Sequence, residues 1–239
     1  MSAAVKRADG ALLRVVAGEA AAYVKSGILA TSGIRVERNA TSATDVGVVF
    51  VHGFAARANQ FSALQRVLGG ETQWFDAYEY NALSPFSEIL AGLRRHLDLA
   101  GSRCRRVVAI GHSLGGLLLR MVLQREDAPA SVAAFVSICA PLHGTTRSRL
   151  GPTRDLRGIA PGTQMFDELA RTVHRLQQHP PRVLAIGARR DHFIRPYTSA
   201  FLEGHERLEL PDSGHVGSLF DPRVHDAVRT VVADLKRKR

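Results

Sequence analysis

VVAIGHSLGG (residues 107–116) runs directly into LLLRMVL (residues 117–123), and this stretch decides the fold. Its first four apolar residues predict a buried strand, and its last seven predict a buried helix. Gly-x-Ser-x-Gly between a strand and a helix is typical of a nucleophile elbow, a tight turn that lifts the serine, here Ser113, out of the sheet. Gly111 and Gly115 fit this turn because a Cβ at either position would collide with the neighbouring strand or helix.

On both sides of this stretch, apolar strands alternate with amphipathic helices. This pattern predicts an α/β fold with a mostly parallel central sheet and helices on both faces. We expect one domain over 1–239, with a helical N-terminal extension over 1–40 and a small lid or helical insertion over 140–181. Residues 33–45 are ambiguous between an extended edge and a loop. The expected strands are 46–51, 73–78, 107–110, 132–139, 182–187 and 205–210, and the expected helices are 11–27, 58–68, 84–99, 114–125 and 217–236.

Composition agrees with such a fold and limits the partners. The chain has 239 residues, of which 45% are hydrophobic and 6% aromatic, which suits one large α/β domain. The formal net charge is +10, but the arginines are scattered, which favours a solvated surface. We therefore expect no nucleic-acid partner, while peripheral contact with anionic lipid surfaces stays open.

Two cysteines, Cys104 and Cys139, are too few for a disulfide framework, so we expect buried thiols and a reducing compartment. The apolar stretch near the N-terminus is broken by Arg14 and Glu19, so no signal peptide is recognisable. No run of residues approaches the length of a membrane span, and no transmembrane segment is expected. Together these features predict a cytoplasmic protein.

A serine hydroxyl needs a base to accept its proton, and that base needs an acid to orient it. After a nucleophile elbow the expected chain order is serine, acid, histidine. Asp191, a few residues after the strand 182–187, is the best acid, and His215, after the last strand, is the best base. The weaker candidates are Asp155 and Asp167 for the acid and His192, His205 and His225 for the base.

An oxyanion hole requires two N–H donors. The backbone N–H of Leu114, directly after the serine, is the first expected donor. The second is expected after the strand 46–51, where the chain reads His52-Gly53-Phe54. Gly53 allows a close backbone approach, so Phe54 N–H is the predicted second donor.

These motifs together resemble the α/β-hydrolases, and more narrowly their bacterial lipase and esterase branch. The resemblance covers roughly residues 45–235 and rests on four segments: His52-Gly53-Phe54, the elbow over 111–116, Pro141-Leu142-His143-Gly144-Thr145, and Asp155-Leu156 with Pro161-Gly162-Thr163. It implies a carboxylesterase or triacylglycerol lipase that acts through an acyl-enzyme on Ser113, on small-molecule or lipid esters. No cofactor and no metal are expected, because no carboxylate cluster supports the structural calcium of some relatives.

We expect substrate to contact Phe54, His112, Leu142, Met165 and Phe166. A thioesterase or an acyltransferase would use the same three catalytic residues, so the sequence leaves both open. A non-catalytic protein of the hydrolase fold is a further alternative, which the intact Ser113, Asp191 and His215 disfavour.

Overall fold

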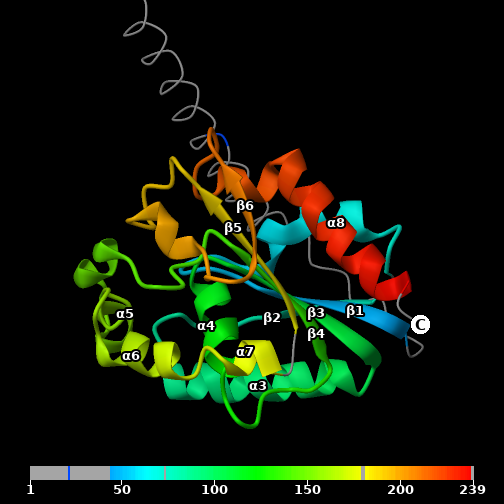
Figure 1. Cartoon of the computed structure of the whole chain (residues 1–239), viewed down its shortest axis with the longest axis horizontal. Coiled ribbons are helices and arrows are strands. Elements are labelled where there is room, and N and C mark those ends of the chain that lie inside the picture. Colours follow the sequence, from blue (N-terminus) through cyan, green and yellow to red (C-terminus); the bar gives the residue numbers. More distant parts are fainter. Residues whose placement is uncertain (1–20, 22–43, 73, 179–180, 238–239) are drawn as a thin grey trace, which may run out of the picture.

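A computed structural model describes residues 21, 44–72, 74–178 and 181–237. Its centre is a six-stranded sheet with the order β2-β1-β3-β4-β5-β6, in which every neighbouring pair is parallel (Figure 1). The strands are β1 Thr44–Val51, β2 Trp74–Tyr78, β3 Cys104–His112, β4 Val132–Ile138, β5 Arg182–Ala188 and β6 Glu206–Leu210. The predicted fold class is confirmed, and all six expected strands are present with small shifts at their ends.

The middle portions of the central strands are largely apolar because both faces of the sheet are covered. Val49 and Val51 of β1 belong to the core on one face, whereas Val48 and Phe50 belong to the core on the other. Side chains of a strand alternate between the two faces, so a strand segment that is covered on both sides consists mostly of apolar residues. The continuous apolar runs in the sequence have this physical origin.

Two pairs of helices cover the sheet. The helices α3 (Phe86–Gly101) and α4 (Leu114–Leu123) pack on one face, and α2 (Ser62–Leu68) and α8 (Pro222–Arg237) pack on the other (Figure 1). Crossover connections in a parallel sheet require such helices. The carboxyl ends of all strands therefore open on one edge, where the functional residues gather.

The segment after β4 holds three short helices and one 3-10 turn, namely α5 Arg154–Arg157, α6 Gln164–Arg171, α7 Arg175–Gln178 and η2 Thr146–Leu150. It is tied to α4 by Arg120, which is almost fully buried. The Arg120 guanidinium donates to the carbonyl oxygens of Leu142 and Leu169, and its Nε donates to Gln124 Oε1 at 2.5 Å. Burial lowers the pKa of Arg120 to about 10.

Several boundaries differ from the expected ones. The expected helix 58–68 begins as a 3-10 turn, η1 (Ala58–Phe61), before α2. The expected final helix 217–236 is a 3-10 turn, η4 (Gly217–Phe220), followed by α8. Asp221 separates the two, because its carboxylate accepts a hydrogen bond from Arg223 N and Pro222 suits the first helical position.

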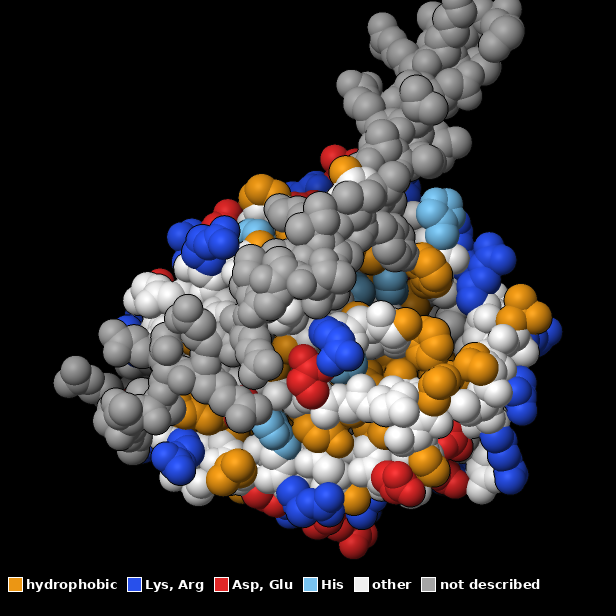
Figure 2. All heavy atoms as spheres, turned by 180° about the vertical axis from the view of Figure 1, so that it is seen from behind, with side chains coloured by type: hydrophobic (Ala, Val, Ile, Leu, Met, Phe, Trp, Pro, Cys, Tyr) orange, Lys and Arg blue, Asp and Glu red, His pale blue; other side chains and the backbone are white. Residues whose placement is uncertain are grey.

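Some expectations lie outside the described residues. These are most of the helix 11–27, the extension 1–40, and the ambiguous stretch 33–45 except for Thr44 and Asp45, which belong to β1. In the described part of the chain, no helix combines the length and the apolar character needed to cross a membrane. On the face seen in Figure 2, arginine and lysine side chains are spread among polar and apolar ones rather than gathered in one patch.

Candidate active site

The predicted elbow lies between β3 and α4. Ser113 has φ 53° and ψ −124°, a left-handed conformation that is costly for a residue with a side chain. Its N–H donates to Ile138 O of the neighbouring β4 at 2.9 Å, and its carbonyl accepts from Gly116 N at 3.0 Å. These bonds hold the strained serine at the carboxyl edge of the sheet.

The two glycines of the motif are required by close backbone contacts. A Cβ at Gly111 would lie 2.5 Å from Gly116 N, at the start of α4. A Cβ at Gly115 would overlap the carbonyl oxygens of Val51 and His52, where β1 ends. Glycine is therefore required at both positions, as the sequence predicts, because α4 passes too close to both strands for any side chain.

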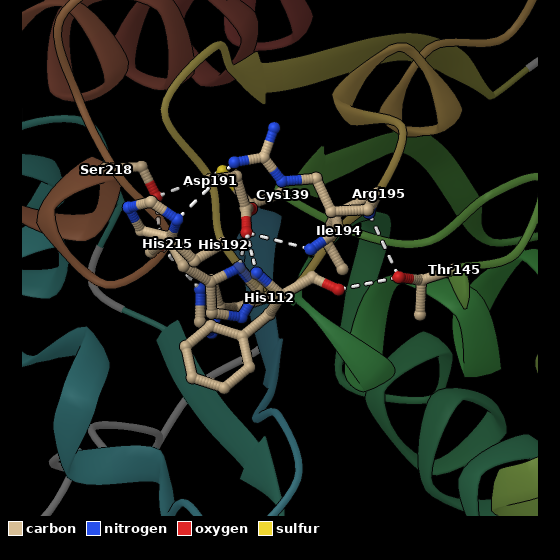
Figure 3. Close-up of polar contacts among 10 residues, drawn as sticks. His112, Cys139, Thr145, Asp191, His192, Ile194, Arg195, His215 and Ser218 are labelled. Carbon is tan, nitrogen blue, oxygen red and sulfur yellow. Dashed lines mark hydrogen bonds and ion pairs between the residues drawn. The ribbon is translucent and has the colours of Figure 1, made fainter. Parts of the chain in front are cut away.

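Asp191 and His215 form a buried hydrogen-bonded pair. His215 Nδ1 donates to Asp191 Oδ2 at 2.7 Å, and the two side chains are 7% and 1% exposed (Figure 3). The other carboxylate oxygen accepts from the N–H groups of Phe193 and Ile194, at 2.7 and 2.9 Å. The structure thus brings together the acid and the base that the sequence predicted, 24 residues apart.

The environment of Asp191 keeps it ionised. Burial by itself raises the pKa of this carboxyl, but the charge of His215 and the three hydrogen bonds it accepts outweigh burial and leave the pKa below its ordinary value. An ionised acid beside the imidazole holds the ring with a proton on Nδ1 and its Nε2 available as a base.

His112, the residue before Ser113, contacts His215 directly. The ring of His112 packs against that of His215 with 4.7 Å between centroids, and its Nε2 donates to His215 O at 3.1 Å. Within the described residues, Ser113 Oγ makes no hydrogen bond with His215. Such bonds often form only when substrate is present.

The predicted oxyanion donors lie beside Ser113. Leu114 is the first residue of α4, and a Cβ on Gly53 would lie 3.0 Å from Ser113 Cβ. The Gly53-Phe54 peptide therefore adjoins the serine side chain. The two N–H groups come from the ends of β1 and β3, which are neighbours in the sheet.

Three of the weaker candidate acids and bases make structural contacts instead, whereas the buried Nε2 of His205 has no hydrogen-bond partner among the described residues. Asp155 Oδ2 accepts from Phe86 N at 2.8 Å and so caps the start of α3. Asp167 lies in the first turn of α6, and the ring of His225 bonds Leu219 O at 2.8 Å. His192 lies against Arg195, 3.4 Å from its Nη2.

The expected substrate contacts do not converge on one pocket. Phe54 is exposed and lines a groove of about 650 Å³ together with Glu79, Tyr80 and Leu83. Met165 lines a separate groove of about 470 Å³ between α3, α4 and α6. Leu142 is fully buried and Phe166 is 9% exposed, and both belong to the hydrophobic core.

Cys139 was not predicted as part of the site. The Sγ of Cys139, a carboxylate oxygen of Asp191 and a ring nitrogen of His215 lie within 4.8 Å of one another. Among the described residues, these three form the one group of side chains that could together hold a metal ion. The Cys139 thiol donates to Ser218 Oγ at 3.4 Å, and Ser218 Oγ donates to His215 O at 2.7 Å (Figure 3). Because Asp191 and His215 already form a hydrogen bond with each other, we interpret Cys139 and Ser218 as packing residues that hold His215 in place.

Neither Cys104 nor Cys139 forms a disulfide, and both are buried, as expected.

Thr145 shows a structural role for the segment 141–145. Its hydroxyl donates to Phe193 O at 2.6 Å and accepts from Arg195 N at 3.0 Å. Gly144 before it has φ 90°, which favours glycine. The segment therefore fixes the loop that carries Asp191, a role that becomes visible only when β4 and β5 are seen as neighbours.

Comparisons with solved structures agree with the observed fold. Est1E from Butyrivibrio proteoclasticus superposes with a TM-score of 0.58 at 15% identity, covering 84% of this chain and 91% of that one. The Bacillus licheniformis lipase BlEst2 gives 0.59 at 14% identity, covering 84% and 96%. A structure reported with the metagenome-derived lipolytic enzymes LipS and LipT gives 0.59 at 16% identity, covering 80% and 94%. These likenesses show the α/β-hydrolase fold.

A comparison with curated protein sequences gives no match. A family model described as palmitoyl protein thioesterase matches residues 47–179, more than half of the chain, a range that includes the His52-Gly53-Phe54 loop and the turn around Ser113. The expected α/β-hydrolase resemblance is confirmed. The chain belongs to the palmitoyl protein thioesterase family and is a hydrolase of the esterase, lipase and thioesterase type.

Proposed function

We propose that the protein is a serine hydrolase that cleaves carboxylic esters through an acyl-enzyme on Ser113. The observation that carries this proposal is the strained Ser113 turn beside the buried Asp191–His215 pair. Strain at a non-glycine residue is kept where function needs it. A buried histidine–carboxylate pair next to a serine is the arrangement that activates a hydroxyl.

The reaction follows from the roles of these groups. His215 Nε2 takes the proton of Ser113 Oγ as the oxygen attacks the carbonyl carbon of the ester, and the carbonyl oxygen becomes an oxyanion. The N–H groups of Phe54 and Leu114 stabilise that charge. His215 then gives its proton to the departing alcohol, and the acyl group stays on Ser113. Water, deprotonated by the same His215, then attacks the acyl-enzyme; the bond to Ser113 Oγ breaks, the acid leaves, and His215 returns the proton to Ser113 Oγ.

Acyl or lipid esters are the proposed substrates. The exposed aromatic ring of Phe54, next to the proposed oxyanion donor, lines a groove of about 650 Å³ that has room for an acyl chain. Contacts of the substrate with His112, Leu142, Met165 and Phe166 stay predictions. A cytoplasmic location and peripheral contact with anionic lipid surfaces remain predictions from composition and charge.

Thioesters are a second candidate substrate class, and the family match favours them. A thiolate is a better leaving group than an alkoxide, so the same serine, base and oxyanion donors serve both bonds. Transfer of the acyl group to an acceptor other than water would change only the second step.

The test compares hydrolysis of p-nitrophenyl esters and of acyl thioesters, each from acetyl to palmitoyl, by the wild type and Ser113→Ala. We expect wild-type activity and a loss of a thousandfold or more in the variant, on the order of losses after removal of a catalytic serine. Ser102→Ala, an exposed serine at the end of α3, is the matched control and should match the wild type.

The two substrate series separate the candidates. A higher kcat/KM on esters of matched chain length supports the carboxylesterase proposal, and a higher value on thioesters supports the second candidate. If Ser113→Ala hydrolyses every substrate as fast as the wild type, the serine mechanism is wrong.

A further inference from the structure

The loop that carries the proposed oxyanion donor Phe54 is held by a cluster that the mechanism does not use. We call it the His52 clamp; it consists of His52, Glu79 and Tyr80. His52 ends the β1 side of the loop, and Glu79 and Tyr80 follow β2, the strand on the far side of β1 from Ser113. His52 is 2% exposed and stacks on the Tyr80 ring with centroids 4.3 Å apart.

The His52 ring bonds the carbonyl of the next residue. Its Nδ1 lies 2.8 Å from Gly53 O. A carbonyl oxygen only accepts hydrogen bonds, so Nδ1 carries the proton and donates it. The same carbonyl also accepts from Ala56 N at 3.4 Å, which closes the turn.

This bond fixes the direction of the Phe54 N–H. Gly53 O and Phe54 N belong to one planar trans peptide, in which C=O and N–H point in opposite directions. The ring that holds Gly53 O sits on the β2 side of the loop, whereas Ser113 follows β3 on the opposite side. Holding the carbonyl toward β2 therefore turns Phe54 N–H toward Ser113.

Glu79 holds both ends of the same loop. Its Oε2 lies 3.2 Å from His52 Nε2, and its Oε1 accepts from Ala58 N at 2.8 Å, where η1 begins. The hydrogen bond with His52 lowers the pKa of the Glu79 carboxyl, although partial burial acts in the other direction. Tyr80 adds a contact of its own, since its hydroxyl donates to His52 O at 2.7 Å.

We propose that His52 is a positioning residue for the oxyanion hole: its Nδ1–H holds the Gly53-Phe54 peptide so that Phe54 N–H faces the reacting carbonyl, and Glu79 and Tyr80 hold His52. This inference rests on the proposed serine mechanism. It assigns the His52 clamp to the orientation of one donor, because none of its side chains needs to contact the substrate's reacting atoms.

Two substitutions of His52 distinguish the roles of its two ring nitrogens. His52→Asn places an amide nitrogen at the position of Nδ1, so it can still donate to Gly53 O. His52→Gln places an amide nitrogen at the position of Nε2, so it keeps the contact with Glu79 and loses the hydrogen bond to Gly53 O. Removing one oxyanion donor costs about 10²–10³ in kcat, so a misdirected donor in His52→Gln should cost about 10–100-fold. We expect His52→Asn to keep about ten times more activity than His52→Gln.

The readouts must differ from those of a merely structural effect. Rates are expressed per active site, counted with a fluorophosphonate, and KM is measured alongside kcat. We expect His52→Gln to lower kcat with KM nearly unchanged. A trifluoromethyl ketone forms an adduct that carries the oxyanion, so its inhibition of His52→Gln should be weakened by about the factor by which kcat falls. Glu79→Ala should lower kcat in the same way as His52→Gln but more weakly, and Glu88→Ala, at an exposed glutamate on α3, should match the wild type.

The proposal is overturned if His52→Gln keeps wild-type kcat per active site, or if His52→Asn and His52→Gln lose kcat equally. Ser113→Ala in the same assays separates this failure from that of the proposed function. An inactive Ser113→Ala with a fully active His52→Gln rejects only the positioning role. A fully active Ser113→Ala rejects the serine mechanism itself.

Discussion

His112 donates a hydrogen bond from Nε2 to the carbonyl oxygen of His215, 3.1 Å away, and its ring packs against the ring of that same residue. His112 directly precedes Ser113, so this contact joins the nucleophile turn to the loop of the proposed base. Within the described ranges, His112 Nδ1 is buried and has no hydrogen-bond partner. A neutral ring with its proton on Nε2 accounts for both observations.

Burial, reinforced by the neighbouring His215, lowers the pKa of His112 from 6.5 to about 3. Between these values the unfolded chain binds a proton on His112 that the folded chain does not. The free energy of unfolding should therefore fall as the pH drops from about 6.5 toward 3, by a few kcal/mol in order of magnitude. Urea unfolding at stepped pH values measures this slope.

A variant isolates the contribution of His112. His112→Gln keeps an amide donor near the Nε2 position but does not titrate, so its free energy of unfolding should depend less on pH over the same window. His174→Gln, at an exposed turn after α6, is the control and should follow the wild type. Equal slopes in the wild type and His112→Gln would contradict the assignment.

The identity of the catalytic acid gives a separate prediction. Asp191→Asn should keep the hydrogen bonds from Phe193 and Ile194 but lose the charge that stabilises protonated His215. We expect kcat to fall by about 10⁴, as in other enzymes with this arrangement, with little change in Tm. Kinetics and thermal melting of the purified variant check both parts.

Asp155→Asn is the matched control for the acid. Its side-chain oxygen can still accept from Phe86 N at the start of α3, so both kcat and Tm should stay near wild type. If Asp155→Asn loses activity and Asp191→Asn does not, the acid has been assigned to the wrong residue.

Local patterns predicted the strands and the elbow because their causes are local. The run Val107–Ile110 is apolar since both faces of the sheet are covered, and the glycines around Ser113 are required by backbone contacts within the same turn. The start of α8 had a local signal too: Asp221-Pro222 combines a capping residue with a residue suited to the first helical position.

The supports of the site could not be predicted because their partners are distant in sequence. Glu79 meets His52 only because β2 pairs with β1, and Thr145 meets Phe193 only because β4 pairs with β5. Cys139 lies near Asp191 through that same pairing. The order of strands in the sheet, which the sequence analysis did not predict, decides each of these contacts.

The elbow glycine Gly115 provides a final prediction, on stability. A methyl group there would overlap the backbone oxygen of Val51, so α4 would have to move away from β1. Backbone is a poor neighbour to displace, and overpacking of this kind costs about 1–3 kcal/mol or more. Gly115→Ala should therefore lower the free energy of unfolding by at least that amount in urea titrations. Gly70→Ala, where a Cβ would meet nothing within 4 Å, is the matched control and should leave stability near the wild-type value. A Gly115→Ala protein as stable as Gly70→Ala would show that α4 and β1 pack less closely than the structure indicates.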